Sequence, residues 1–79
     1  MSPTVHEEQG FRFVIYYNDH PPAHIHVIKG GLSCKIGIDP VEVIENKGMK
    51  ANDRRKALSI AARIQAHLQN EWDKVHAPD

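Results

Sequence analysis

Three of the six histidines in this 79-residue chain fall within residues 20–26. They are His20, His24 and His26, and Asp19 directly precedes them. If residues 24–29 form a strand, His24 and His26 stand at positions i and i+2. They then project from the same side of the strand, with Cα atoms about 6–7 Å apart. Two neighbouring imidazoles suit proton transfer near neutral pH or the binding of a metal ion.

The spacing of these histidines leaves three interpretations open. In the first, His24 and His26 exchange protons with a phosphodiester as general base and general acid, without a metal cofactor. In the second, Asp19, His20, His24 and His26 bind a divalent metal such as zinc. In the third, the two rings are solvated on an exposed strand and His20 packs against a proline. The sequence therefore leaves open whether the protein is an enzyme.

The elements that must position these residues are predicted from composition and periodicity. In the first part of the chain, strand-like segments are separated by turn residues, with Gly30-Gly31 as a hairpin turn. Later in the chain, apolar residues recur every three or four positions, as in a helix with one buried face. The expected strands are residues 4–7, 11–17, 24–29 and 32–38, with 41–46 ambiguous between an edge strand and a helical turn. One helix is expected over residues 51–76. The predicted fold is a single α+β domain, residues 1–79, in which strands and loops occupy 1–46. Its small antiparallel sheet has three to four strands, and one long C-terminal helix packs on one face.

Alternation along the strands predicts which side chains this helix leaves uncovered. Ile25, Val27 and Ile36 belong to the apolar side, and the opposite face is polar and cationic. The residues expected on that open face are Arg12, Tyr16, His24, His26, Ser33 and Lys35. In the first interpretation, proton exchange with a phosphodiester, Lys35 and Arg12 stabilise the charge that develops on the phosphate beside the two histidines. Tyr16 and His20 are then expected to position the substrate.

A second candidate feature is a basic stretch at the start of the predicted helix. Residues 47–56 contain five basic side chains and one acidic one, although the whole chain has a formal net charge of zero. Basic groups at a helix N-terminus oppose the helix dipole unless an anion binds there. Lys50, Arg54, Arg55 and Lys56 are therefore expected to contact an RNA backbone or an acidic protein surface.

Composition bounds the remaining possibilities. Zero net charge excludes a globally polybasic nucleic-acid binder, and no apolar stretch approaches the ~20 residues that a membrane span needs. The N-terminus lacks the pattern of a signal peptide, and the single cysteine, Cys34, reads as a small buried apolar residue. A cytoplasmic protein without membrane contact is expected. Because so short a chain supports only a small core, a homodimer or a partner chain is expected too.

The histidine segment and its surroundings resemble a known family. The residues that carry the resemblance are Gly10-Phe11-Arg12-Phe13, Asn18-Asp19-His20-Pro21-Pro22 and His24-Ile25-His26-Val27. It continues through Asp39-Pro40-Val41-Glu42 and Asn46-Lys47-Gly48 to a basic helix that ends near Trp72. The family consists of small bacterial proteins known chiefly as a domain of unknown function. Its members are often encoded beside a second small domain, in an arrangement that looks like a toxin–antitoxin pair.

The leading functional hypothesis combines the residues with this resemblance. It is a small component of toxin–antitoxin type that binds RNA, with metal-independent ribonuclease activity if it is an enzyme. One alternative is a non-catalytic module, an antitoxin or a phage-type inhibitor, that binds an acidic partner encoded by the neighbouring gene. The other alternative is a histidine-based metal-binding protein. The first two hypotheses need no cofactor, and the third needs a divalent metal.

Overall fold

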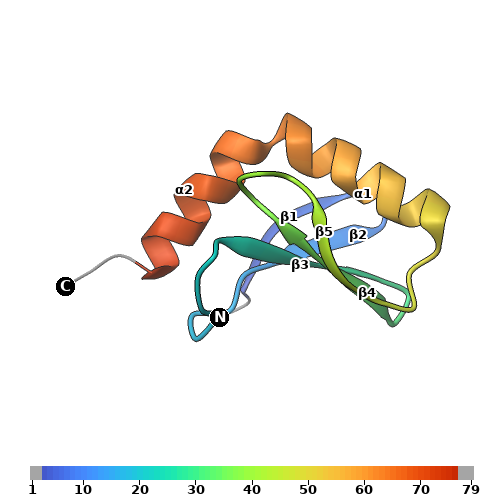
Figure 1. Ribbon diagram of the computed structural model, residues 1–79, viewed down its shortest axis with the longest axis horizontal. Coiled ribbons are helices and arrows are strands. Elements are labelled where there is room, and N and C mark those ends of the chain that lie inside the picture. The colour runs from blue at the N-terminus through green and yellow to red at the C-terminus, as the bar shows by residue number, and fades with distance from the viewer. Residues whose placement is uncertain (1–2, 77–79) are drawn as a thin grey trace.

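Five antiparallel strands and two helices make up the part of the chain that the computed structural model describes, residues 3–76 (Figure 1). The strands lie in the sheet in sequence order, each hydrogen-bonded to the next. They are β1 (Thr4–Glu8), β2 (Phe11–Val14), β3 (His24–Lys29), β4 (Leu32–Gly37) and β5 (Val43–Lys47). The helices are α1 (Ala51–Arg63) and α2 (Gln65–His76). The predicted α+β class is confirmed.

The prediction of three to four strands is wrong, because the ambiguous segment forms a fifth strand. β5 pairs with the free edge of β4, where Lys35 faces Glu45, and the register shifts between Lys35 and Ile36. The predicted strand 11–17 also ends early, at Val14. The Asp19 N–H donates to the Tyr16 carbonyl at 3.0 Å and the Tyr16 N–H donates to the Asp19 carboxylate at 3.1 Å. This turn bends the chain away from the sheet just after β2 ends.

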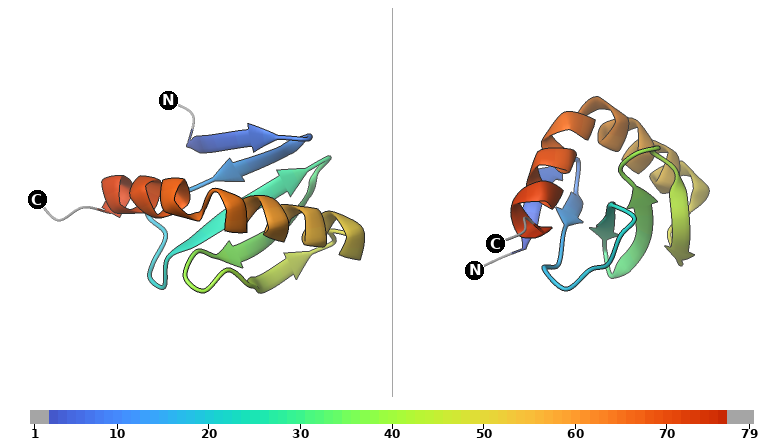
Figure 2. Two further views of the ribbon diagram at one scale, coloured as in Figure 1. Left: turned by 90° about the horizontal axis from the view of Figure 1, so that it is seen from above. Right: turned by 60° about the vertical axis from the view of Figure 1, so that its left-hand side comes forward.

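The prediction of one continuous helix is also wrong, since the helix is broken at Ile64. The backbone there has φ −105° and ψ 21°, outside α-helical geometry, although its N–H still donates to the Ile60 carbonyl. Next to the break, the Gln65 amide donates to the Ile38 carbonyl at 2.7 Å, just beyond the end of β4. The break changes the direction of the helix, and α2 therefore curves around the end of the sheet (Figure 2).

The core lies between the helices and one face of the sheet. Ile25, Val27 and Ile36 are fully buried there and belong to one cluster with Ile60 and Leu68 of the helices. The predicted parity is confirmed for Ile25, Val27 and Ile36, which lie on the side of the sheet that packs against the helices. Cys34 is also buried, as predicted. Burial raises the pKa of its thiol, which disfavours the nucleophilic thiolate.

Gly37 at the end of β4 allows a loop to pass close to the sheet. A Cβ atom at this position would lie 2.8 Å from the Pro40 carbonyl oxygen, and the Gly37 N–H donates to the Glu42 carbonyl at 2.7 Å. Only a residue without a side chain fits there. Gly37 is the cross-strand partner of His24, so this close approach also shapes the surroundings of the histidines.

In the described part of the chain, neither helix has the length and apolar character that crossing a membrane requires.

Candidate functional site

Asp19, His24 and His26 converge at the start of β3. The Asp19 carboxylate lies 3.1 Å from His26 Nε2 and 3.6 Å from His24 Nε2. One ligand atom from each residue lies within 4.8 Å of the other two. The two histidines are neighbours on one side of the strand, with ring centroids 5.2 Å apart. We call these three residues the His–Asp–His cluster.

Asp19 is held in place by the turn that ends β2. Its carboxylate accepts the Tyr16 N–H and a hydrogen bond from His26 Nε2. Burial opposes ionisation of this carboxyl, but the Tyr16 N–H bond, the His26 hydrogen bond and the charges of His26 and His24 outweigh burial and lower the pKa of Asp19. Asp19 is therefore a carboxylate at neutral pH, with its negative charge directed at both imidazoles.

His24 is buried, which corrects the prediction that its ring lies on an open face. Its residue is only 7% exposed, because the Trp72 ring of α2 packs at 5.3 Å between centroids. Ile25 next to it faces the core as predicted, but Trp72, itself a member of the core cluster, also packs against the His24 ring. His24 Nδ1 lies 2.9 Å from the Pro22 carbonyl oxygen. Since a carbonyl only accepts, Nδ1 carries a proton and Nε2 is the atom directed at Asp19.

His26 forms the accessible side of the cluster. Its side chain is 24% exposed, and the Tyr16 ring packs edge-on against it at 5.0 Å. Lys35 lies directly across from His26 on β4. Of the residues predicted on the open face, Tyr16 and Lys35 are therefore brought next to the cluster.

Two residues of α2 complete the surroundings of the cluster, and the sequence interpretation gave them no role in the site. His76 stacks on Trp72 at 3.8 Å and donates from Nε2 to the Asp19 carbonyl at 2.8 Å. Its Nδ1 lies 3.0 Å from the Trp72 carbonyl. The only available signal was that residues 72 and 76 share a face of a helix. Nothing in the sequence indicated that this face meets residue 19.

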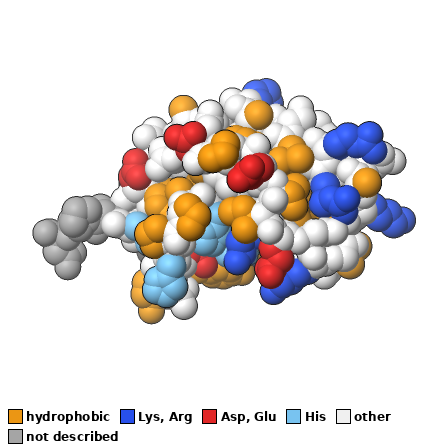
Figure 3. Space-filling model, in the orientation of Figure 1, with side chains coloured by type: hydrophobic (Ala, Val, Ile, Leu, Met, Phe, Trp, Pro, Cys, Tyr) orange, Lys and Arg blue, Asp and Glu red, His pale blue; other side chains and the backbone are white. Residues whose placement is uncertain are grey.

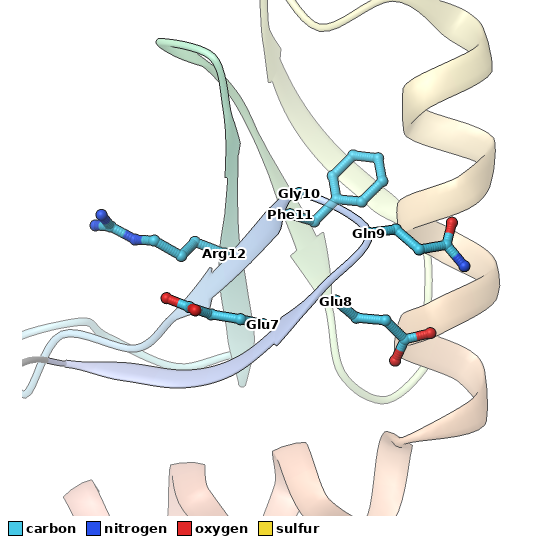
Figure 4. Close-up of a pocket in the computed structure, with 6 residues that line it drawn as sticks. All are labelled: Glu7, Glu8, Gln9, Gly10, Phe11 and Arg12. Atoms are coloured by element: carbon cyan, nitrogen blue, oxygen red, sulfur yellow. The ribbon is translucent and has the colours of Figure 1, made fainter.

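His20 and Arg12 do not converge with the cluster. His20 is exposed, and it is not among the described residues whose ligand atoms come together. Arg12 is the cross-strand partner of Glu7 on β1 and of Ile28 on β3. Figure 4 shows Arg12 and Glu7 extending to the same side of the β1–β2 hairpin, and both are among the residues that line a hollow of about 350 Å³. Arg12 is thus a cross-strand neighbour of Glu7, whereas Val14 is the β2 residue that pairs with His26.

The basic residues of α1 lie at the other end of β3. Lys29, the last residue of β3, forms an ion pair with Asp53 in the first turn of α1 at 3.4 Å. The first turn of α1 is thus separated from His24 by the length of the strand, roughly 16 Å. Figure 3 shows the same separation, with most Lys and Arg side chains of this face toward the start of α1 and the histidines toward the end of α2. The basic residues that were predicted to bind substrate therefore lie away from the His–Asp–His cluster; they are Lys50, Arg54, Arg55 and Lys56.

A small hollow of about 70 Å³ borders the cluster on its accessible side. It lies over β3, β4 and β5, and the residues around it are His26, Ser33, Cys34, Lys35, Glu45 and Lys47. The Glu45 carboxylate lies 3.9 Å from the ammonium groups of both Lys35 and Lys47. This hollow is therefore continuous with the His–Asp–His cluster through His26.

Comparison with known proteins identifies the family of the chain but no activity. None of the curated proteins and none of the solved structures matches it significantly. A family model matches residues 10–73, which include the His–Asp–His cluster, the hollow beside it and most of both helices. The chain belongs to the family described as Domain of unknown function (DUF4160).

Proposed function

We propose that this protein binds a divalent transition-metal ion through Asp19, His24 and His26. The observation that carries the proposal is the hydrogen bond from His24 Nδ1 to the Pro22 carbonyl. It leaves the lone pair of a neutral His24 at Nε2, 3.6 Å from an ionised carboxylate oxygen. Two electron-rich atoms facing each other are stabilised by a cation between them. A histidine that binds metal through one nitrogen and donates to a backbone carbonyl from the other is the usual arrangement at metal centres.

The distances within the cluster suit this role. Ligand atoms bound at 2.0–2.1 Å in tetrahedral geometry lie about 3.3 Å from one another. The contacts of Asp19 with the two imidazoles, 3.1 and 3.6 Å, bracket that separation. Small movements of the two imidazole rings are enough to bring all three ligand atoms to the separation that a bound metal requires. The Asp19 loop is already fixed by its turn with Tyr16.

The types of ligand and the number of ligands indicate the kind of metal centre. Two imidazoles and one carboxylate suit zinc or iron(II), and three protein ligands leave at least one position for water or substrate. The side of the cluster toward Trp72 is buried, and the side at His26 is partly exposed. An open position is therefore expected beside His26, as in a metal centre that acts on a substrate.

The metal-independent ribonuclease interpretation has less support from the geometry. Both ring nitrogens of His24 are directed at protein oxygens, and Trp72 covers the ring. Proton exchange between this histidine and a phosphodiester would require that cover to open. RNA binding, pairing with a neighbouring-gene product and a homodimer stay predictions from the sequence.

A cobalt titration of protein purified without a His tag tests the proposal. Cobalt(II) gives visible absorption bands on binding, and it is expected to quench the single tryptophan, Trp72, which packs on His24. We expect one ion per chain, with affinity at least about 100-fold lower in Asp19→Asn and His26→Gln. His20→Gln is the matched control, because His20 lies outside the cluster, and it should keep the wild-type affinity. Equal affinities in wild type and Asp19→Asn would contradict the proposal.

A further inference from the structure

We infer that the hollow beside His26 is a binding site for a phosphate group. The inference deepens the proposed metal centre and rests on it, since the phosphate would occupy the open position of the metal and the hollow together. The chemical class of the ligand follows from the side chains around the hollow and from its size.

The charges around the hollow favour an anion. Lys35 and Lys47 bring two ammonium groups, and Glu45 brings one carboxylate between them. The Glu45 side chain is half exposed and lies 3.9 Å from either ammonium, so it can turn toward water when a stronger anion arrives. Without that carboxylate the hollow has two positive charges beside the hydroxyl of Ser33, which is a further donor.

The register of the sheet connects the hollow to the cluster. Lys35 is the cross-strand partner of His26, and side chains at such positions lie about 5 Å apart at Cβ. An anion that binds a metal on the accessible side of His26 therefore has its remaining oxygens within reach of the Lys35 ammonium. Lysine is a common point-charge partner for phosphate, and metals commonly bind the same phosphate.

Size and geometry favour phosphate over smaller anions. About 10–15 Å³ is enough for one water molecule, so the hollow of about 70 Å³ holds a group of several heavy atoms. A tetrahedral phosphate can direct separate oxygens to the metal, to Lys35 and to Lys47. A carboxylate has only two oxygens and a single charge, and it leaves one of these partners unmatched.

Inorganic phosphate added to the cobalt-loaded protein tests the inference. Phosphate that binds the metal changes the cobalt absorption bands, so the affinity can be measured directly. We expect Lys35→Met, which keeps the length of the side chain and removes its charge, to weaken phosphate binding at least tenfold while the cobalt affinity stays within about twofold. Lys74→Met, which removes the charge of an exposed lysine on α2, is the matched control and should leave both affinities unchanged.

Three outcomes separate this inference from the proposed metal centre. If cobalt binds but wild type and Lys35→Met take up phosphate equally, the phosphate site is wrong and the metal centre stands. If cobalt does not bind, the metal centre is wrong, and phosphate is then titrated into the metal-free protein by calorimetry. Binding that depends on Lys35 would support the phosphate site without a metal, and its absence would overturn it.

A second ligand distinguishes the source of the phosphate. A short single-stranded RNA and inorganic phosphate are titrated in parallel into the cobalt-loaded protein. RNA binding at least as tight as phosphate binding, and weakened by Lys35→Met, supports a phosphodiester in RNA. Phosphate binding without RNA binding supports a small phosphorylated molecule at the same site.

Discussion

Asp19 is the residue on which the candidate site depends most. It contacts both imidazoles through its carboxylate, and its backbone joins the turn after β2 to the end of α2 through Tyr16 and His76. A carboxylate with several polar contacts stabilises the metal-free fold as well as a bound metal. The effect of Asp19 on the stability of the metal-free protein can therefore be measured separately from its effect on metal binding.

The stability of the metal-free protein should depend on pH through Asp19. Hydrogen bonds and nearby charge outweigh burial and lower its folded pKa below the ordinary value of 3.8. The ionised group therefore stabilises the fold above about pH 4, and this contribution is lost as the pH falls through the folded pKa. Urea denaturation with a chelator present should show Asp19→Asn to be less stable than wild type at pH 6.

The same comparison at lower pH gives the control. The difference between wild type and Asp19→Asn should narrow as the pH falls below about 4 and through the folded pKa, because Asp19 then becomes protonated in the folded wild type too. A difference that stays constant over this range would mean that the charge of Asp19 does not contribute to stability.

At the scale of the elements, the break at Ile64 determines what α2 covers. A straight continuation of α1 would leave the start of β3 uncovered, whereas α2 brings Trp72 against His24 and His76 against Asp19. The Gln65 amide, which donates to the Ile38 carbonyl at 2.7 Å, ties this break to the sheet.

Removing that hydrogen bond should destabilise the protein. Gln65→Ala leaves the carbonyl of the buried residue Ile38 without this donor, and the expected loss is about 1 kcal/mol of the free energy of unfolding. Gln69→Ala is the matched control in the same helix, since Gln69 contacts Asp73 in an exposed pair, and it should cost less than about 0.5 kcal/mol. Urea denaturation measures both. Equal losses in the two variants would show that the Gln65 contact does not hold the break.

The elements that could be predicted from the sequence are those whose ends are marked by adjacent turn or proline residues. β3 was predicted with its observed limits because Pro21-Pro22 and Gly30-Gly31 bracket it. The break at Ile64 has no proline or glycine to mark it, and the apolar period continues through it. β5 could not be distinguished from a helical turn because its strand pairing depends on β4 rather than on its own composition.

The candidate site shows the same difference between contacts that are local in the sequence and contacts between distant residues. Asp19, His24 and His26 are close in sequence, so the metal alternative named all three, together with His20, which the structure places outside the cluster. The cover from Trp72 and His76 joins residues more than 45 positions apart, and no local pattern predicts such a contact. The sequence also grouped the α1 cations with the histidines, which the length of β3 keeps apart.

At the scale of the molecule, the two polar regions have different surroundings. The histidine end is partly buried and combines one carboxylate with imidazole rings and a tryptophan, whereas most of the cations at the start of α1 are exposed (Figure 3). A metal ion would add positive charge at the histidine end and leave the α1 region unchanged. The proposed function therefore depends on whether a metal occupies the His–Asp–His cluster.

Anomalous diffraction at the zinc absorption edge, from crystals grown with zinc, tests this most directly. We predict one strong anomalous peak about 2.0–2.2 Å from His24 Nε2, His26 Nε2 and an Asp19 carboxylate oxygen, with a water or anion on the His26 side. Zinc bound only elsewhere, with His24 Nε2 and Asp19 still in direct contact, would contradict it.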